Sequence, residues 1–326
     1  MRKIEVSAPG KLMLFGEHAV VYGRPCIVTA VDQRMKVKIE IKPGKKIKIE
    51  APDVGIKGYS KRIDSLGKER NMPKGVRFLE MAVKNFFGKY QVKSGLKIKT
   101  KSEFSSKFGF GSSSAVTVAS LKGLAILFQK RLDKRGLFDL AYKTVFDVQG
   151  VGSGFDLAAA IWGGTIFFVT GGKKIVPLKV KKLPLVIGYT GIKADTPTLV
   201  RQVARFRQRH PRLVNGIFDD ISFLTQEAKK DLIRGNLRRV GELMNLNQGF
   251  LDALGVNTER LSNLIFAARN TGAYGAKLSG AGGGDCMIVL VAKNKRLEIE
   301  KAIKKERGEV INVDTRAEGV RIEQRY

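Results

Sequence analysis

The sequence predicts an α+β protein with two domains that meet near residue 180. Of its 326 residues, 43% are hydrophobic, a share that suits two domains or one large one. Segments that alternate apolar and charged residues, as strands do, are interspersed with segments whose apolar residues recur at helical spacing. Near residue 180 the pattern changes to KKLPLVIGYTG, which predicts a new strand. We therefore expect one domain over 1–180 and another over 181–326.

The first domain is expected to mix strands and helices. The segment MKVKIEIKPGKKIKIEA predicts a hairpin turned at Pro43-Gly44. Gly150 is a residue type that suits the left-handed cap at the end of a helix. The expected elements are strands at 4–15, 34–50 and 95–104, helices at about 75–88, 109–132 and 137–150, and a passage from small residues into a strand at 155–178.

The second domain is expected to contain more helix than strand, and no fixed-period repeat occurs in it. The expected elements are strands at 181–191 and 286–292, and helices at about 196–209, 216–233, 236–247 and 254–272.

Hydropathy and cysteine usage favour a cytoplasmic protein that does not enter a membrane. The sequence has no stretch of 18 uncharged apolar residues, and its N-terminus meets an acid, Gly and Pro before a signal-like apolar run forms. Cys26 and Cys286 lie far apart without a CxxC pair, and the chain has only two histidines. A structural zinc site is therefore not expected.

The formal net charge of +30, from 60 basic and 30 acidic residues, attracts polyanions of any kind. The basic residues are spread along the chain, and no zinc-finger, RNA-binding or basic-zipper pattern is present. Solvated basic faces are the favoured interpretation. Steering of small anions and weak binding to RNA or DNA are the alternatives, so a non-catalytic nucleic-acid-binding protein is our second hypothesis.

Two glycine-rich stretches are candidate ligand-binding loops: GFGSSSA taken alone favours an ordinary capped helix, whereas KLSGAGGGDC favours a close approach of the backbone to a ligand. In GFGSSSA, from Gly109 to Ala115, serines begin a helix, where free N–H groups attract a phosphate and a hydroxyl can ligate Mg²⁺. In KLSGAGGGDC, four glycines stand within five positions before an apolar strand. A capped helix and a flexible turn, each without a ligand, are the alternatives.

Three further motif residues and one loop acid are candidates for chemistry. SAPGKLMLFGEHAVVYG places Lys11 at the start of an apolar strand and Glu17 and His18 after a turn. Asp156 follows a loop with three glycines in QGVGSGFD. Singly, such residues are more often solvated or hydrogen-bonded than catalytic. None of the glycine loops has the pattern of a Walker loop or of a dinucleotide fold.

Taken in order, PGKLMLFGEHAVVYG, GFGSSSAVTVASLKGL, SGFDLAAAIWGG and GAKLSGAGGGDCMIVL resemble the motifs of the GHMP small-molecule kinases. The resemblance covers nearly the whole chain and is closest to the archaeal mevalonate kinases. It implies an N-terminal α+β domain and a ferredoxin-like C-terminal α/β sandwich, with the active site in the cleft between them. The implied reaction is ATP- and Mg²⁺-dependent phosphorylation of the 5-hydroxyl of mevalonate. Related kinases are often homodimers.

The resemblance also implies roles for individual residues. Asp156 would be the base that faces the substrate hydroxyl, with Lys11 beside it to neutralise charge on the transferred phosphoryl group. Ser113 would be the Mg²⁺ ligand. The residues expected at the ATP phosphates are Gly109, Phe110, Gly111, Ser112, Ser113, Ser114 and Ala115. Those expected at the acceptor are Glu17, His18, Thr190, Thr196, Gly280, Ala281, Gly282 and Gly283.

Two positions depart from the expected pattern. Mevalonate kinases usually carry a glutamate, as a second Mg²⁺ ligand, where this chain has Val145. Either Asp147 reaches the metal in a shifted register, or Ser113, phosphates and water hold it. Asp285 in GAGGGDC, like GSGFDLAAA, is more similar to phosphomevalonate kinases, so 5-phosphomevalonate is the alternative acceptor. GEHAVVYG and the C-terminal similarity favour mevalonate.

Overall fold

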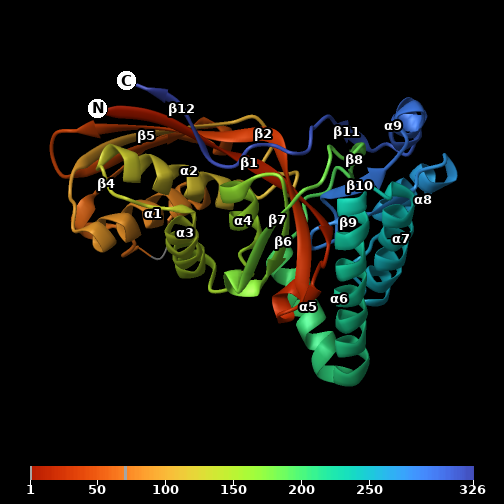
Figure 1. Cartoon of the computed structure of the whole chain (residues 1–326). Coiled ribbons are helices and arrows are strands. Elements are labelled where there is room, and N and C mark those ends of the chain that lie inside the picture. The colour runs from red at the N-terminus through yellow and green to blue at the C-terminus, as the bar shows by residue number, and fades with distance from the viewer. Residues whose placement is uncertain (1, 70–71) are drawn as a thin grey trace.

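The computed structural model describes residues 2–69 and 72–326, and these residues form two β-sheets covered by helices (Figure 1). The first sheet contains β1 (Lys3–Phe15), β2 (Pro25–Lys42), β3 (Lys46–Ala51), β4 (Ile56–Arg62), β5 (Gly95–Ser102), β6 (Thr165–Val169), β7 (Lys174–Leu178) and β12 (Arg321–Arg325). The second contains β8 (Leu185–Tyr189), β9 (Gly275–Ser279), β10 (Cys286–Leu290) and β11 (Glu309–Ile311).

The first sheet has the strand order β12-β1-β2-β5-β3-β4, and β6 and β7 extend it from the other end of β2. The predicted strands at 34–50 form, but the predicted hairpin is wrong. The chain does turn at 43–45, yet β5 lies between β2 and β3, antiparallel to the first and parallel to the second. Alternation along a segment reports which face of a strand is buried, not which strand will pair with it.

The helices of the first 180 residues are α1 (Lys74–Tyr90), α2 (Ser112–Leu127), α3 (Lys134–Gln149) and α4 (Phe155–Trp162). Figure 1 shows them on one side of the first sheet. Helix α2 packs directly against β1 and β2, and most of its residues are buried. Large side chains buried in this way each contribute about 1.5–3 kcal/mol to folding. This packing holds the N-terminus of α2 rigidly at the edge of the domain.

The ends of the helices in this half show where the sequence signals were sufficient. Helix α3 begins where the carboxylate of Asp133 accepts a hydrogen bond from the Gly136 N–H, and it ends at Gly150 with a φ of 69°, as predicted. The short helix α4 had been expected only as small residues leading into a strand. Gly154 precedes it with a φ of 93°, so the turn into α4 depends on a glycine.

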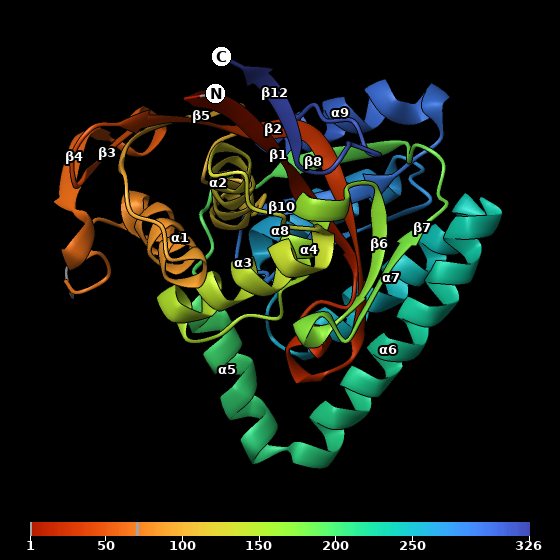
Figure 2. The same ribbon diagram turned by 60° about the vertical axis from the view of Figure 1, so that its left-hand side comes forward.

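The second sheet is antiparallel with the order β11-β8-β10-β9, the 4-1-3-2 arrangement of a ferredoxin-like fold, as the sequence resemblance implied. Its helices are α5 (Thr196–Arg209), α6 (Pro211–Arg234), α7 (Leu237–Ala253), α8 (Glu259–Asn270) and α9 (Arg296–Lys305). Figure 2 shows α5 and α6 as an arm that projects from the body. Pro211 begins α6 directly after α5, a position where its missing N–H costs nothing.

The two sheets are tied together at several points. The Ser279 hydroxyl donates to the carbonyl of Met13 and accepts from its N–H, both at 3.0 Å, which joins β9 to β1. Strand β12 returns to pair with β1, with Arg325 opposite Ile4. The N-terminal and C-terminal strands therefore lie side by side (Figure 1). The last strand thus belongs to the first sheet, and the division at residue 180 stays a prediction.

Within the described ranges, none of the helices combines the length and the apolar character that crossing a membrane requires.

Candidate active site

A lysine and an aspartate from distant parts of the chain meet beside the first glycine loop. Nζ of Lys11, on β1, lies 3.7 Å from Oδ1 of Asp156, in the first turn of α4. The same ammonium donates a hydrogen bond of 2.8 Å to the carbonyl of Gly109, and the Lys11 N–H donates to the carbonyl of Phe110 at 3.0 Å. The strand, the loop and the helix are therefore joined through one lysine.

The surroundings of Asp156 suit a proton acceptor. Its side chain is 31% exposed while that of Lys11 is 9% exposed, so the pair lies at the rim of a buried region. Burial raises the pKa of Asp156, and the charge of Lys11 partly offsets this rise. Oδ1 of Asp156 is shielded from solvent and accepts no hydrogen bond from the described residues. A hydroxyl group would therefore approach the carboxylate from its exposed side, away from the buried Oδ1.

The first glycine loop brings the N-terminus of α2 against this pair. Gly109 and Gly111 have φ values of 71° and 77°, which disfavour other residues. A Cβ atom on Gly111 would lie 3.4 Å from Cε of Lys11 and 3.6 Å from Cβ of Asp156, so the loop passes closely over both side chains. The first N–H groups of α2 have no partner within the helix, as at helix ends that bind anions.

The serines at the start of α2 differ in exposure. Ser112 and Ser113 are half-buried, whereas Ser114 is buried. The carbonyl of Ser113 accepts a hydrogen bond from the Thr117 hydroxyl, a contact that keeps the first turn regular. Two serine hydroxyls are therefore available at the helix end, and the third belongs to the packed interior.

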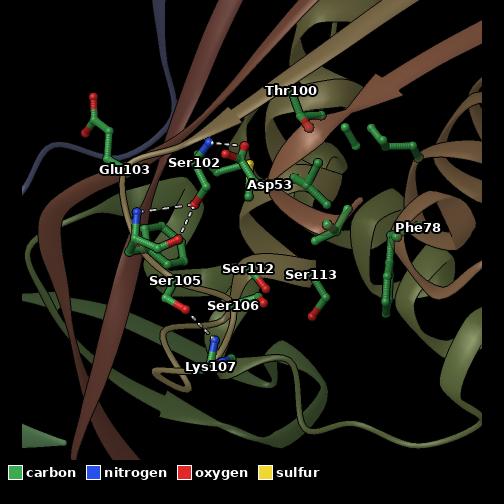
Figure 3. Close-up of a pocket in the computed structure, with 17 residues that line it drawn as sticks. Asp53, Phe78, Thr100, Ser102, Glu103, Ser105, Ser106, Lys107, Ser112 and Ser113 are labelled. Atoms are coloured by element: carbon green, nitrogen blue, oxygen red, sulfur yellow. Dashed lines mark hydrogen bonds between the residues drawn. The ribbon is translucent and has the colours of Figure 1, made fainter. Parts of the chain in front are cut away.

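A cavity of about 500 Å³ opens next to these serines (Figure 3). It lies between α1, the start of α2, and the segment that follows β5. Asp53 shapes one wall, because its carboxylate accepts a hydrogen bond of 2.8 Å from the Ser102 N–H. Its lining includes Asp53, Phe78, Thr100 and Ser106. The cavity is continuous with the helix end, since Ser112 and Ser113 line it too.

Glu17, which was expected to line the acceptor position, lies behind the surface of the site. Its carboxylate forms an ion pair with Lys277 of β9, and both side chains are 0% exposed. Nδ2 of Asn247, on α7, donates to the other oxygen of Glu17 at 3.3 Å. A buried charge needs a partner, so this carboxylate is committed to Lys277. In this structure Glu17 supports the site and offers no exposed atom to a ligand.

His18 joins the N-terminal turn to the second glycine loop. Its Nε2 lies 2.9 Å from the carbonyl of Ala281. A carbonyl oxygen only accepts, so Nε2 carries the proton and donates. Burial lowers the pKa of His18, which favours the neutral ring. The residue has a φ of 57°, a left-handed conformation that is uncommon outside glycine.

The second glycine loop is packed against two neighbouring backbones. A Cβ atom on Gly282 would come within 2.2 Å of the carbonyl oxygen of Val256, and one on Gly284 within 2.6 Å of that of Ile192. Both glycines have positive φ values. Only glycine fits these two positions, and the loop is therefore held in one shape rather than left flexible.

The two threonines expected at the acceptor differ. The Thr190 hydroxyl is buried and donates to the backbone carbonyl of Asp285 at 3.1 Å, so it holds backbone together. Thr196 is exposed at the first residue of α5. Of this pair, only Thr196 presents its side chain at the surface.

Asp147, the second candidate metal ligand, is hydrogen-bonded to two neighbouring side chains. Its carboxylate accepts hydrogen bonds from Nζ of Lys143 at 2.7 Å and from Nδ2 of Asn85 at 2.9 Å. Burial raises the pKa of Asp147, but these two donors outweigh it and hold the pKa below its usual value. Val145 is buried on another side of α3. Among the described residues, no three His, Cys, Asp or Glu side chains gather in a way that could hold a metal ion.

Sequence reasoning missed three side chains and the cavity. Lys277 stands in the motif GAKLSGAGGGDC, but neither it nor Asn247 was singled out, because a lysine in a strand and an asparagine in a helix usually face solvent. Asp285 was noted only as a departure from a motif. The serines in KSEFSSK stand between a strand and the glycine loop, and that cluster was the available signal for the cavity wall.

Comparisons with known proteins agree with this arrangement. The chain matches the GHMP kinases N terminal domain over residues 77–164 and the GHMP kinases C terminal domain over residues 228–309. A mevalonate kinase of Pyrococcus furiosus is 38% identical over 336 residues, which cover 99% of each chain. The crystal structure of the Methanococcus jannaschii mevalonate kinase has a TM-score of 0.82 at 27% identity, covering 95% of this chain and 98% of that chain.

A phosphomevalonate kinase of Streptococcus pneumoniae shares the fold, with a TM-score of 0.76 over 97% of this chain and 100% of that chain, but is only 18% identical. The similarity to the mevalonate kinase sequences is thus the greater one and spans the full length of the chain. The chain belongs to the GHMP kinase family and, within it, groups with the archaeal mevalonate kinases.

Proposed function

We propose that this protein transfers the γ-phosphoryl group of ATP to the 5-hydroxyl of mevalonate, giving 5-phosphomevalonate and ADP for isoprenoid synthesis. The observation that carries the proposal is the Lys11–Asp156 pair beneath the glycine loop, in which the side chain of Asp156 stays 31% exposed. The full-length similarity to the Pyrococcus furiosus mevalonate kinase supports the choice of acceptor.

The nucleotide is proposed to bind across the cavity and the start of α2. Its phosphates would lie on residues 109–115, where free N–H groups and the helix dipole attract negative charge. Its base and ribose would occupy the adjacent cavity, whose wall includes the ring of Phe78 and the side chains of Asp53 and Thr100 (Figure 3). A volume of about 500 Å³ suits a ligand of this size.

Mg²⁺ fits the oxygen donors at the end of α2. This ion keeps several waters and is usually held by one or two protein groups together with substrate phosphates. Ser113 would therefore hold it, with phosphate oxygens and water as the other ligands. Asp147 is a poorer candidate for a second ligand, because Lys143 and Asn85 both donate to Oδ2 of its carboxylate and hold the side chain on α3. When bound, the ion would neutralise charge on the phosphates during transfer.

The chain's own residues would carry the proton and stabilise the charge. The carboxylate of Asp156 would accept the proton of the 5-hydroxyl as the oxygen attacks the γ-phosphorus and the bond to the β,γ-bridging oxygen breaks. The positive charge of Lys11 would favour the ionised form of Asp156 and stabilise the transferring phosphoryl group. Because phosphoryl transfer depends mainly on positioning and charge, this small set of groups is sufficient.

A coupled assay of ADP release tests the acceptor. Mevalonate and 5-phosphomevalonate are compared at equal concentrations with ATP and Mg²⁺. Turnover of mevalonate supports the proposal, and turnover of only the phosphorylated acceptor would replace it with the phosphomevalonate kinase alternative.

A cytoplasmic location and a homodimer stay predictions. Both cysteines are free and buried, which is compatible with a reducing compartment. Analytical ultracentrifugation tests the dimer. Nucleic-acid binding, the remote alternative, is tested by its salt dependence, since attraction to the general charge of +30 weakens steeply with added salt.

A further inference from the structure

Asp285 ends the second glycine loop in a conformation that disfavours most side chains. Its φ is 54°, a left-handed value, at a position that follows Gly282, Gly283 and Gly284. The side chain is nonetheless kept there and is buried, with the residue 7% exposed. Aspartate tolerates this conformation better than most residues, but a glycine would adopt it without cost. The contacts of the carboxylate therefore indicate why an aspartate occupies this position.

The first set of contacts joins Asp285 to the segment between β8 and α5. Its N–H donates to the carbonyl of Ile192 at 2.7 Å, and its carbonyl accepts from the N–H of Thr190 at 3.0 Å. Oδ1 of its side chain accepts a hydrogen bond of 2.9 Å from the Ala194 N–H. The carboxylate thus fixes the segment 190–194, which leads directly to Thr196 at the start of α5.

The second contact is with the other half of the molecule. Oδ2 of Asp285 would lie 2.7 Å from a Cβ atom on Gly109, so the carboxylate rests against the backbone of the first glycine loop. The carbonyl of the same Gly109 accepts the hydrogen bond from Lys11. Burial raises the pKa of Asp285, and the Ala194 N–H, Lys193 and Lys11 lower it. Gly109 therefore lies between the catalytic lysine and a second carboxylate.

Two neighbours of Asp285 attach to the same loop. Nζ of Lys193 donates to the carbonyl of Ser106 at 2.6 Å, and Sγ of Cys286 donates to the carbonyl of Phe108 at 3.2 Å. Together with Asp285 against Gly109, these contacts hold positions 106, 108 and 109. Ser106 also lines the cavity proposed for the nucleotide. The C-terminal half therefore contacts the loop at several positions. The side chain of Asp285 contacts both the 190–194 segment and the first glycine loop.

We propose that Asp285 is a positioning residue that couples the acceptor region to the nucleotide loop, because one carboxylate oxygen holds the Ala194 N–H while the other rests against Gly109. Acceptor bound near the second glycine loop and Thr196 stabilises the 190–194 segment. Through Asp285 this stabilises the loop that holds the ATP phosphates. Each substrate then tightens binding of the other by the same factor, since coupling between two sites is reciprocal.

This inference rests on the proposed function, and its test separates the two. Binding of a non-hydrolysable ATP analogue with Mg²⁺ is measured by titration calorimetry, with and without saturating mevalonate. The wild-type protein, Asp285→Asn and Asp285→Gly are compared. Asparagine keeps the acceptor oxygen for Ala194, while glycine removes the side chain and suits the observed φ. Asp220→Asn, at an exposed acid on α6, is the matched control.

We expect mevalonate to tighten analogue binding about fivefold or more in the wild-type protein, in Asp220→Asn and in Asp285→Asn. In Asp285→Gly the ratio of the dissociation constants of the analogue, without and with mevalonate, falls to near one. The KM values of both substrates rise, while the midpoint of thermal unfolding does not fall. This combination separates positioning from a role in stability alone.

Three results overturn the inference. The first is a wild-type protein that phosphorylates mevalonate but binds the analogue equally well with and without it. The second is a ratio of dissociation constants that stays at the wild-type value in Asp285→Gly. The third is a fall of this ratio in Asp285→Asn that is as large as in Asp285→Gly. The last result would assign the effect to the charge and not to the link. The proposed function fails separately, if the wild-type protein does not phosphorylate mevalonate in the ADP-release assay.

Discussion

The carboxylate of Glu17 and the ammonium of Lys277 form an ion pair with no exposed surface on either side chain. The pair joins the turn after β1 to strand β9. Glu17 directly precedes His18, which contacts the carbonyl of Ala281, and Lys277 lies two residues before Ser279, which donates to the carbonyl of Met13. Asn247 donates to the free oxygen of Glu17, and Lys277 also donates to the carbonyl of Leu278 at 2.6 Å. The pair therefore anchors the turn after β1 to β9.

Removing one partner of this pair should destabilise the protein strongly. Lys277→Met or Glu17→Gln alone leaves the other group buried without its partner, and each is expected to lower the free energy of unfolding by about 3–5 kcal/mol. The double variant should cost less than the sum of the two. Urea unfolding checks this. Lys295→Met, at an exposed pair with Glu298, is the control and should have no measurable effect. Additive costs would contradict the assigned pairing.

Asp156→Asn should abolish most turnover without preventing nucleotide binding. The amide cannot accept the hydroxyl proton as the carboxylate does, so kcat is expected to fall by about 10²–10⁴. The phosphates are held by the loop and by α2, and the dissociation constant for ATP should change little. ADP release and titration calorimetry measure the two effects. Near-normal kcat in this variant would remove Asp156 from the role of base.

Lys11 should set the acid limb of the pH profile. Asp156 acts as a base only when ionised, and burial raises its pKa, so kcat/KM is expected to fall with decreasing pH at a higher pH than for an ordinary aspartate. Lys11 lowers that pKa, and Lys11→Met should therefore move the acid limb to higher pH as well as reduce kcat. A pH series of kcat/KM tests this. An unshifted limb in Lys11→Met would disprove the electrostatic link.

Mg²⁺ dependence should distinguish Ser113 from Asp147. Ser113→Ala removes the proposed ligand and is expected to raise the Mg²⁺ concentration for half-maximal turnover about tenfold or more. Asp147→Asn should leave that concentration unchanged, because Lys143 and Asn85 occupy its carboxylate. The activation curve for Mg²⁺ is measured at saturating ATP. A larger effect in Asp147→Asn than in Ser113→Ala would assign the metal to α3.

Arg34 should be essential for the attachment of the C-terminal segment. Its buried guanidinium donates to the carbonyls of Ser7, Glu318 and Gly319, and burial lowers its pKa to about 10. A lysine cannot reproduce this planar fork, so Arg34→Lys is expected to cost about 2–4 kcal/mol.

Urea unfolding and protease sensitivity near residue 318 measure that cost. Arg62→Lys, at an exposed pair with Asp64, is the control and should leave both unchanged. Equal stability of Arg34→Lys and the wild-type protein would show that the segment is held by strand pairing alone.

The sequence was a good guide to elements and a poor guide to their partners. Alternation predicted strands over 34–50, where β3 and the second part of β2 lie, but it did not predict the start of β2 at Pro25. The expected hairpin pairing was wrong, since β5 lies between the two strands. The ladder between β2 and β5 joins residues about 60 positions apart, with Met35 opposite Ser102 at one end. Pairing over such a distance depends on the packing of the whole sheet, and no local pattern contains it.

The candidate site divides in the same way. Lys11, Gly109, Gly111 and Asp156 were expected together from three of the four ordered motifs, and the structure places them in contact. Glu17 was expected at the acceptor, but its carboxylate is fully buried and paired with Lys277. Whether a charged residue faces a ligand or a buried partner depends on what packs against it from elsewhere in the chain.

The sequence by itself determined the family, the two-part α+β architecture and the glycine-bearing motifs, because backbone conformations such as those of Gly109 and Gly111 restrict the residue type locally. Only the tertiary structure decided that Asp147 is held by Lys143 and Asn85, and that Asp285 rests against Gly109. These are contacts between segments that fold next to one another, and their energies depend on burial and distance, which a linear pattern does not contain.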